Sequence, residues 1–195
     1  MKYIVGLTGP TGSGKSTFSV IAESKGFFVI DCDKVSRDVT KQGSEALKKL
    51  SDLFGEDIIK DSFLDRKLLA ARAFKDEKSK QLLEDTIFPY ILNGVMEKIE
   101  NCKNDKILLD APTLFESGID EICGTVVAIL SPPEIRKKRI IERDNLTKEQ
   151  AEVRMSAGKN DEFYIDRADY IINNNSQKSE FSAQCEEIIN ILLED

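Results

Sequence analysis

The sequence predicts a three-layer α/β/α fold in which helices cover a parallel sheet. Two observations lead to this prediction. Short apolar runs alternate along the chain with segments of helical periodicity, which is typical of consecutive strand–helix–strand units. The first apolar run also leads directly into a glycine-rich segment followed by a helix, an arrangement that places ligands at the carboxyl ends of the strands.

The expected strands are short runs rich in β-branched and apolar residues, which favour buried positions in a sheet. They are 3–7, 27–30, 106–109, 125–130 and 170–172. The expected helices are 15–25, 44–54, 65–74, a long stretch from residue 77 that is interrupted at Pro89, a basic helix after residue 133, a short helix after 147, and a last helix from about 179. Thr147 and Gln150 have the spacing of a capping box, and Asp65 is a candidate N-cap.

The order of these elements predicts one domain, 1–195, with two excursions from its core. The core is expected to comprise about 1–32, 105–135 and 166–195. A helical insertion occupies about 33–104, where the strand pattern stops, and a short basic lid occupies about 136–165. The chain has 195 residues, 41% of them hydrophobic, which is enough for one well-packed core.

Composition limits the partners and the compartment. A net charge of −7 argues against nucleic acid or an anionic membrane as the main partner, since both attract cationic surfaces. The amino-terminal apolar run is too short for a signal peptide, and the four scattered cysteines form no C-x-x-C pair, so we expect free thiols and a cytoplasmic location. The oligomeric state is left open, with a monomer favoured.

Histidine is absent from the sequence. This removes the residue that most often acts as a general base and most often binds transition metals. Acid and base chemistry is therefore expected to fall to carboxylates.

The glycine-rich segment after the first strand, GPTGSGKS, matches the phosphate-binding pattern G-x-x-x-x-G-K-[ST] at each specified position. Its glycines let backbone N–H groups turn towards phosphate oxygens at a helix N-terminus. The lysine adds a mobile positive charge, and the serine hydroxyl can bind Mg²⁺. This motif assigns the fold to the P-loop NTPases and predicts that a nucleoside triphosphate is bound by Gly9, Pro10, Thr11, Gly12, Ser13, Gly14, Lys15, Ser16 and Thr17.

Three aspartates follow strands of the predicted sheet. Asp31 and Asp33 come at the end of the second strand, where a carboxylate can accept the proton of an attacking hydroxyl or hold Mg²⁺ through water. The structural alternative is an N-cap of the next helix, and we favour chemistry for Asp33 while leaving Asp31 open. Asp110 ends the third strand and is predicted, with Ser16, to hold Mg²⁺; its alternative is a turn residue before Pro112.

Residues 136–143 contain five cations and one anion in a chain that is otherwise acidic. On a helix, Arg136, Arg139 and Arg143 share a face from which guanidinium groups could clamp phosphates. A solvated surface is the alternative for such a run. The need to neutralise a triphosphate, together with the downstream cations Arg154, Lys159 and Arg167, favours a closing lid.

Several segments together resemble the dephospho-CoA kinase family. They are the phosphate loop preceded by GLT, the turn IDCD with Arg37 following, LDR at 64–66, PTLFE at 112–116 and ADYIINN at 168–174. The resemblance covers nearly the whole chain. It implies transfer of the γ-phosphoryl group of ATP to the ribose 3′-hydroxyl of dephospho-CoA, which gives CoA and ADP.

The resemblance also implies roles for individual residues. Asp33 would be the base that faces the hydroxyl, and Lys15, Arg139 and Arg143 would complete the catalytic set. The helical insertion would hold the acceptor, and the segment around Asn175 would lie by the adenine of ATP. Acceptor contacts are then expected from Asp31, Asp33, Arg37, Arg66, Pro112 and Leu114.

The sequence departs from the family pattern at two places. Phe88 precedes Pro89 where the family commonly has histidine, and Gly158 follows Arg154 where the family has glutamine.

Two alternative functions remain. One is a kinase of another small hydroxyl or nucleotide acceptor on the same scaffold, and the other is a nucleotide-dependent switch ATPase. A switch is disfavoured because Asp110 is followed by Ala-Pro-Thr in place of a D-x-x-G segment.

Overall fold

A computed structural model describes residues 2–175 and 177–194 of the chain. Met1, Ser176 and Asp195, which fall in the expected core segments, lie outside the described residues. The chain forms two compact units: Met1–Ile30 with Lys103–Asp195, and Asp31–Cys102. The second unit begins at 31 and ends at 102, whereas the sequence placed the insertion at 33–104.

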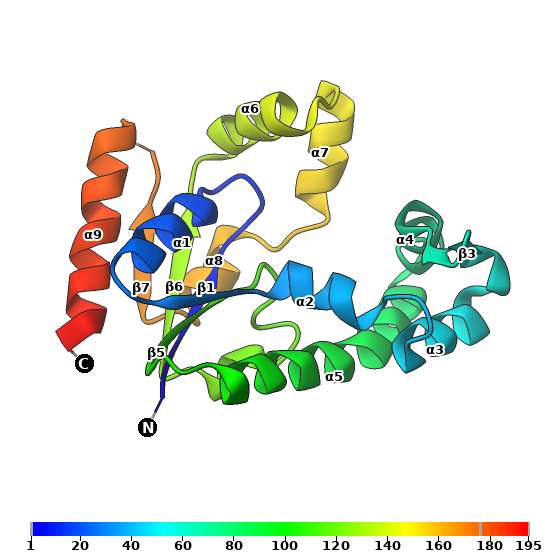
Figure 1. The fold of residues 1–195 in the computed structure, drawn as a ribbon. Helices are drawn as coiled ribbons and strands as arrows, with labels where there is room; N and C mark the ends of the chain where they lie inside the picture. Colours follow the sequence, from blue (N-terminus) through cyan, green and yellow to red (C-terminus); the bar gives the residue numbers. More distant parts are fainter. Residues whose placement is uncertain (1, 176, 195) are drawn as a thin grey trace. The chain divides into compact units, whose positions relative to one another are not determined.

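The first unit contains a five-stranded sheet with the order β2-β5-β1-β6-β7. Its strands are β1 (Tyr3–Thr8), β2 (Phe28–Asp31), β5 (Lys106–Asp110), β6 (Thr125–Leu130) and β7 (Tyr170–Asn173) (Figure 1). The ladders of β1 with β5, of β1 with β6 and of β6 with β7 are parallel. Parallel pairing brings the ends of these strands, and the segments that follow them, to one edge of the sheet.

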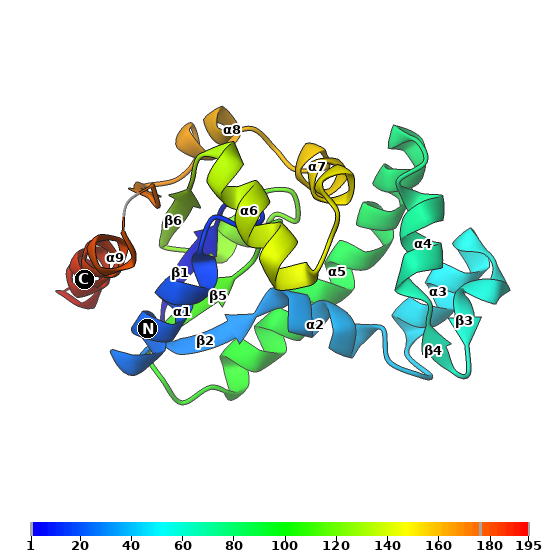
Figure 2. The same cartoon turned by 90° about the horizontal axis from the view of Figure 1, so that it is seen from above.

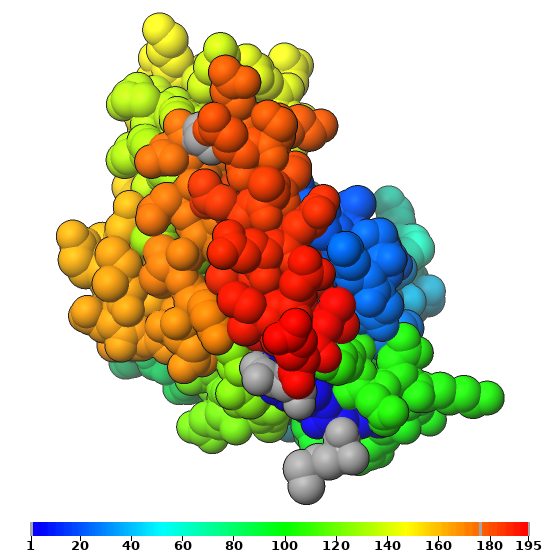
Figure 3. Space-filling model, turned by 90° about the vertical axis from the view of Figure 1, so that its left-hand side faces the viewer, coloured from blue at the N-terminus to red at the C-terminus, as the bar shows by residue number. Residues whose placement is uncertain are grey.

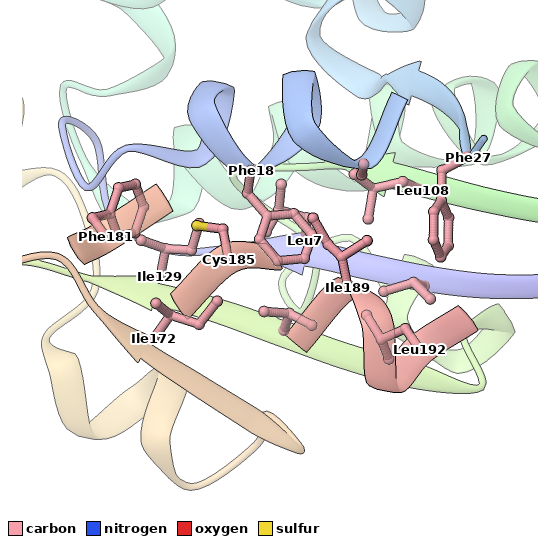
Figure 4. Packing of buried hydrophobic residues seen from close by; sticks show 13 residues of the cluster. Leu7, Phe18, Phe27, Leu108, Ile129, Ile172, Phe181, Cys185, Ile189 and Leu192 are labelled. Atoms are coloured by element: carbon pink, nitrogen blue, oxygen red, sulfur yellow. The ribbon is translucent and has the colours of Figure 1, made fainter. Parts of the chain in front are cut away.

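One face of the sheet is covered by α1 (Lys15–Ser24) and α9 (Lys178–Glu194). Figure 4 shows their apolar side chains meeting those of the central strands. Leu7, Phe18 and Ile189 are fully buried there. The helices α1 and α9 also contact each other, and Figure 3 shows α9 beside the α1 region at the surface. This packing fixes the helix that follows the phosphate loop.

The opposite face carries the short helix α8 (Asp161–Ile165), through a cluster in which Tyr164 packs against Ala128 and Leu130. The helices α6 (Pro133–Asp144) and α7 (Lys148–Ser156) follow β6 and contact each other (Figure 2). Thr147 and Gln150 form the expected capping box at the start of α7. A short 3₁₀ helix, Ile119–Ile122, precedes β6.

The second unit is mainly helical. Its elements are α2 (Cys32–Val39), α3 (Glu45–Phe54), a 3₁₀ turn (Glu56–Ile58), the hairpin of β3 (Ile59–Lys60) and β4 (Phe63–Leu64), α4 (Arg66–Ala73) and α5 (Glu77–Asn101). Side chains of Ser44, Asp65 and Asp76 cap α3, α4 and α5. The helix α5 contacts α2, α3 and α4, and so forms the centre of this unit.

The expected interruption at Pro89 is wrong, because α5 continues through this residue. Proline removes one backbone donor and crowds the preceding turn, which usually kinks or ends a helix. Here Ile87, Ile91 and Val95 are buried on both sides of the proline. Their burial holds the helix on its neighbours and offsets the lost hydrogen bond.

The predicted fold class is confirmed, because the structure has a parallel sheet with flanking helices, and its strands and helices alternate in the expected order. Within the residues that the structure describes, no helix is long and apolar enough to cross a membrane.

Candidate functional site

The phosphate loop begins at Gly9, directly after β1, and ends where α1 begins at Lys15. Because β1 is the central strand of the sheet, the loop opens at the edge where Asp110 and Leu130 end the two neighbouring strands. Gly9, Gly12 and Gly14 all have positive φ angles. The loop conformation therefore depends on residues without a Cβ atom.

Gly9 and Gly14 are required by close approach as well as by backbone angle. A Cβ atom on Gly9, at φ +133°, would lie 2.2 Å from the carbonyl oxygen of Ile129 in β6. A Cβ atom on Gly14, at φ +112°, would lie 2.3 Å from Nδ2 of Asn174. The loop backbone is thus packed directly against β6 and against the segment after β7.

Gly9→Ala is expected to lower the free energy of unfolding by more than the strain of a positive φ alone, which costs roughly 1–3 kcal/mol. The backbone of β6 cannot move away as a flexible side chain could. Urea denaturation measures this, with Gly26→Ala as control: Gly26 also has a positive φ, +100°, but nothing within 4 Å of its Cβ position. Equal losses in the two variants would contradict the packing argument.

The start of α1 is suited to an anion. Gly14 is its N-cap and makes no side-chain cap, and the first turn holds no acidic residue. Backbone N–H groups at such a helix start attract negative charge. Nζ of Lys15 donates to the carbonyl oxygen of Gly9 at 2.7 Å, which holds the ammonium group at the loop. Oγ of Ser13 is buried and has no hydrogen-bond partner among the described residues.

Ser16, the predicted magnesium ligand, is exposed in the first turn of α1, and Thr17 follows it. Asp110 ends β5, and its Oδ2 accepts a hydrogen bond from Oγ of Ser19 at 2.8 Å. Ser19 lies three residues after Ser16 on α1, so this bond ties the Asp110 carboxylate to the helix that carries Ser16. Among residues 2–175 and 177–194, no group of three or more cysteine, aspartate or glutamate side chains could hold a metal ion by itself.

Arg139 on α6 lies against the phosphate loop. Its Nη1 is 3.3 Å from the carbonyl oxygens of Gly12 and Ser13 and from Oγ of Ser131. Its Nη2 donates to Oδ1 of Asn174 at 3.0 Å. Partial burial lowers the pKa of its guanidinium. The sequence predicted Arg139 as a phosphate-clamping residue of the lid, and not as a residue bonded to the backbone of the phosphate loop.

The other two arginines of the predicted shared face have different surroundings. Arg136 is buried, and its guanidinium lies 3.8 Å from the carboxylate of Asp161. Arg143 is exposed and makes two bonds of 2.8 Å to Asp144, which also accepts from Arg154 at 2.6 Å. The three arginines therefore do not form one phosphate-facing surface within α6.

The predicted acceptor residues Asp31 and Asp33 lie in the second unit. Asp31 caps α2 by accepting a hydrogen bond from the N–H of Lys34 at 2.9 Å. Asp33 is exposed in the first turn of the same helix. The capping role that the sequence considered for Asp33 thus belongs to Asp31.

Arg37 and Arg66 lie in the same unit as these aspartates. Nε of Arg37 donates to the carbonyl oxygen of Asp33 at 3.2 Å, and Arg66 donates to Oγ1 of Thr40 at 2.7 Å. Partial burial and the charge of Arg37 together lower the pKa of Arg66. Two like charges within electrostatic reach of each other favour an anionic ligand.

Three further predicted site residues of the first unit are Pro112, Leu114 and Asn175. Pro112 accepts a hydrogen bond from Oγ1 of Thr8 at 3.4 Å. Leu114 is fully buried, and a Cβ atom on Gly6 would lie 2.7 Å from its Cδ2, so Leu114 packs inside the first unit and offers no exposed surface to an acceptor. Asn175 is exposed directly after the buried Asn174.

Sequence reasoning missed Ser19, Ser131 and Asn174. Asn174 was included in the segment ADYIINN and in the loop expected beside the adenine, but it was given no contact of its own; Ser131, directly after the strand 125–130, was given no role. Ser19 carried a weak signal, since it lies one helical turn beyond Ser16 and shares its face. None of the three has a local pattern that indicates which distant group it contacts.

Comparisons of the sequence and of the structure with known proteins both find similarity to dephospho-CoA kinases. The dephospho-CoA kinase family model matches residues 3–180. The dephospho-CoA kinase of Idiomarina loihiensis is 34% identical over 189 residues, covering 96% of this chain and 94% of that one. A dephospho-CoA kinase structure from Campylobacter jejuni is 31% identical, with a TM-score of 0.71 over 97% of this chain and 96% of that chain. A shikimate kinase from Bacteroides thetaiotaomicron, 14% identical with a TM-score of 0.55 over 97% of this chain and 98% of that one, shares the fold.

Proposed function

The chain belongs to the dephospho-CoA kinase family, and from this we propose how its residues transfer the γ-phosphoryl group of ATP to the ribose 3′-hydroxyl of dephospho-CoA. A bond forms between the 3′-oxygen and the γ-phosphorus while the bond to the β-phosphate oxygen breaks, giving CoA and ADP. The observation that carries the proposal is the phosphate loop, packed between β6 and the segment after β7 in a chain of this family.

The loop residues 9–17 bind the phosphates of ATP. Backbone N–H groups at the start of α1 donate to phosphate oxygens, and the hydroxyl of Ser13, which has no partner among the residues that the structure describes, fits an additional contact to such an oxygen. Lys15 moves its ammonium group from the carbonyl of Gly9 to the β- and γ-phosphates. Asn175, exposed in the segment that follows β7, lies by the adenine.

Ser16 and Asp110 fit a Mg²⁺ ion, because Ser16 offers a hydroxyl oxygen in the first turn of α1, Asp110 offers a carboxylate oxygen at the end of β5, and this ion prefers oxygen and retains several waters. Bound Mg²⁺ would supply positive charge to the outer phosphate oxygens. The hydrogen bond from Ser19 to Asp110 fixes the orientation of the carboxylate on which this fit depends.

Asp33 is the general base. Its carboxylate orients the 3′-hydroxyl and accepts its proton as the new P–O bond forms. Asp31 caps the helix that carries Asp33 and so positions it, besides any contact of its own with the acceptor. Asp33 is exposed, as a base that must meet a bound substrate has to be.

Acceptor binding is assigned to the helical insertion, residues 33–104, and, in the first unit, to Pro112; the full burial of Leu114 leaves that residue a packing role. Arg37 and Arg66 are suited to the phosphate groups of dephospho-CoA, because the pKa of Arg66 already reflects the nearby charge of Arg37 and an anion would relieve that repulsion. Residues 136–165 form the lid, and Arg139 and Arg143 neutralise the charge of the transferring group.

We also propose which partners the protein binds and where it is located. The substrate is a small molecule, dephospho-CoA, and neither nucleic acid nor a membrane is the main partner, in keeping with a net charge of −7. We expect a cytoplasmic monomer, which size-exclusion chromatography with light scattering would test for the oligomeric state.

The function is tested by offering dephospho-CoA, adenosine, shikimate and uridine separately with Mg·ATP and identifying the phosphorylated product. We expect rapid ADP formation only with dephospho-CoA, and a product phosphorylated at the 3′-oxygen. Equal ATP consumption without any acceptor would indicate a switch ATPase. Preferred phosphorylation of another acceptor would replace the proposed substrate.

A further inference from the structure

Asn174 occupies a position between the phosphate loop and α6 that neither the proposed mechanism nor its acceptor contacts use. It follows β7 directly and is only 4% exposed. Its backbone N–H donates to the carbonyl oxygen of Leu130, and its own carbonyl accepts from Oγ of Ser131, each at 2.7 Å. These two bonds attach Asn174 to the end of β6 and leave its carboxamide to make other contacts.

The carboxamide of Asn174 joins two groups of the donor site. Nδ2 donates to the carbonyl oxygen of Ser13 at 2.7 Å, and Oδ1 accepts from Nη2 of Arg139 at 3.0 Å. A carbonyl can only accept and a guanidinium can only donate, so the two partners together determine which way the amide faces. Each of the four polar atoms of Asn174 has a partner.

These contacts act on one peptide unit of the loop. The carbonyl oxygen of Ser13 accepts hydrogen bonds from Nδ2 of Asn174 at 2.7 Å and from Nη1 of Arg139 at 3.3 Å. Because a trans peptide is planar, its C=O and the next N–H point in opposite directions. Holding the Ser13 oxygen towards Asn174 therefore turns the N–H of Gly14 to the other side of the loop.

Gly14 shows how tightly this arrangement is packed. A Cβ atom at this position would lie 2.3 Å from Nδ2 of Asn174 and 3.3 Å from Cε1 of Phe181. The amide thus occupies the space that any side chain at position 14 would need. The geometry of the loop and the placement of Asn174 depend on each other.

We propose that Asn174 is a positioning residue for ATP: its carboxamide holds the Ser13–Gly14 peptide with its N–H available to a phosphate oxygen and holds Arg139 against the loop. This inference rests on the proposed function and adds to it a residue that links the segment beside the adenine to the phosphate site. It acts on the donor substrate, so the binding of dephospho-CoA is expected to be independent of it.

The test compares Asn174→Ala and Asn174→Asp with the wild-type protein. Isothermal titration gives the Kd for Mg·ATP, and steady-state kinetics give the KM for each substrate. We expect the Kd for Mg·ATP to rise about tenfold, because buried polar groups lose their partners. The KM for dephospho-CoA at saturating ATP should stay within about twofold, since the carboxamide bonds only the donor site.

The aspartate variant keeps the shape of the side chain and its contact with Arg139, but places a second acceptor against the Ser13 oxygen. It should therefore weaken ATP binding at least as much as alanine does, even if the alanine variant folds poorly. Asn101→Ala is the control for removing an asparagine amide, because Asn101 is exposed and its Nδ2 donates to the carbonyl oxygen of Glu97 in its own helix. It should bind Mg·ATP as the wild type does.

A double-mutant cycle with Arg139→Ala tests the link between the two side chains. The rise in the Kd for Mg·ATP in the double variant should be smaller than the product of the two fold-changes measured in the single variants. Independent effects, or a lower melting temperature with an unchanged Kd for Mg·ATP in both variants, would overturn the positioning role. Failure of the wild-type protein to bind Mg·ATP would instead overturn the proposed function.

Discussion

Asp33→Asn is expected to lower kcat by roughly 10²–10⁴, the usual contribution of a positioned general base. The amide cannot accept the proton of the 3′-hydroxyl, although it keeps the size of the side chain. The Kd for Mg·ATP should change little, because the proposed role of Asp33 is exerted on the acceptor hydroxyl and not on ATP. Single-turnover phosphorylation of dephospho-CoA, measured beside ATP titrations, separates the two quantities.

Two matched variants control for structure. Asp52→Asn removes a charge from an exposed position of α3 in the same unit and should leave kcat unchanged. Asp31→Asn keeps a good N-cap for α2, so the helix that carries Asp33 should remain intact. Near-normal turnover in the Asp33→Asn protein would remove Asp33 from the role of base.

Lys15→Met is expected to lower kcat by roughly 10²–10³, the effect of removing one electrostatic contact to developing charge. Methionine keeps most of the aliphatic side chain and has high helix propensity, so α1 should still begin at this position. The variant also loses the bond to the carbonyl of Gly9, whose net contribution to stability is only about 1 kcal/mol. Steady-state kinetics and a thermal melt distinguish these two effects.

Lys25→Met provides the comparison for a lysine lost elsewhere on the same helix. Lys25 is exposed at the end of α1, opposite the phosphate loop, and should tolerate the change. A Lys15→Met protein whose turnover matched that of Lys25→Met would show that the ammonium group does not serve the transferring phosphate.

Much of the fold could be predicted because its signals are local. Strand β6 spans the predicted residues, and the predicted cap at Asp65 begins α4; α3 begins one residue after the predicted start. The hairpin β3–β4 was missed because its turn residues Asp61 and Ser62 have positive φ without the glycine that usually indicates such a turn. Pro89 misled the prediction for α5 because burial along the helix outweighs the local penalty.

The site also has features that the sequence predicted and features that it missed. The loop glycines were found because a positive φ and a close backbone approach restrict residue type, and this restriction is visible in the sequence itself. The environments of Arg136 and Arg143 were not found, because periodicity places residues on a helix face without indicating what packs there. One arginine became buried, and the other joined an exposed ion pair.

The sequence by itself determined the donor loop, the helix that follows it and the parallel sheet, because these depend on backbone angles and on hydrophobic periodicity along a continuous segment. Only the tertiary structure decided which distant groups complete the site. Asn174 meets Ser13 across 161 residues and Ser19 meets Asp110 across 91. Such contacts depend on how the strands pair and how α1 packs on the sheet, so no local pattern specifies them.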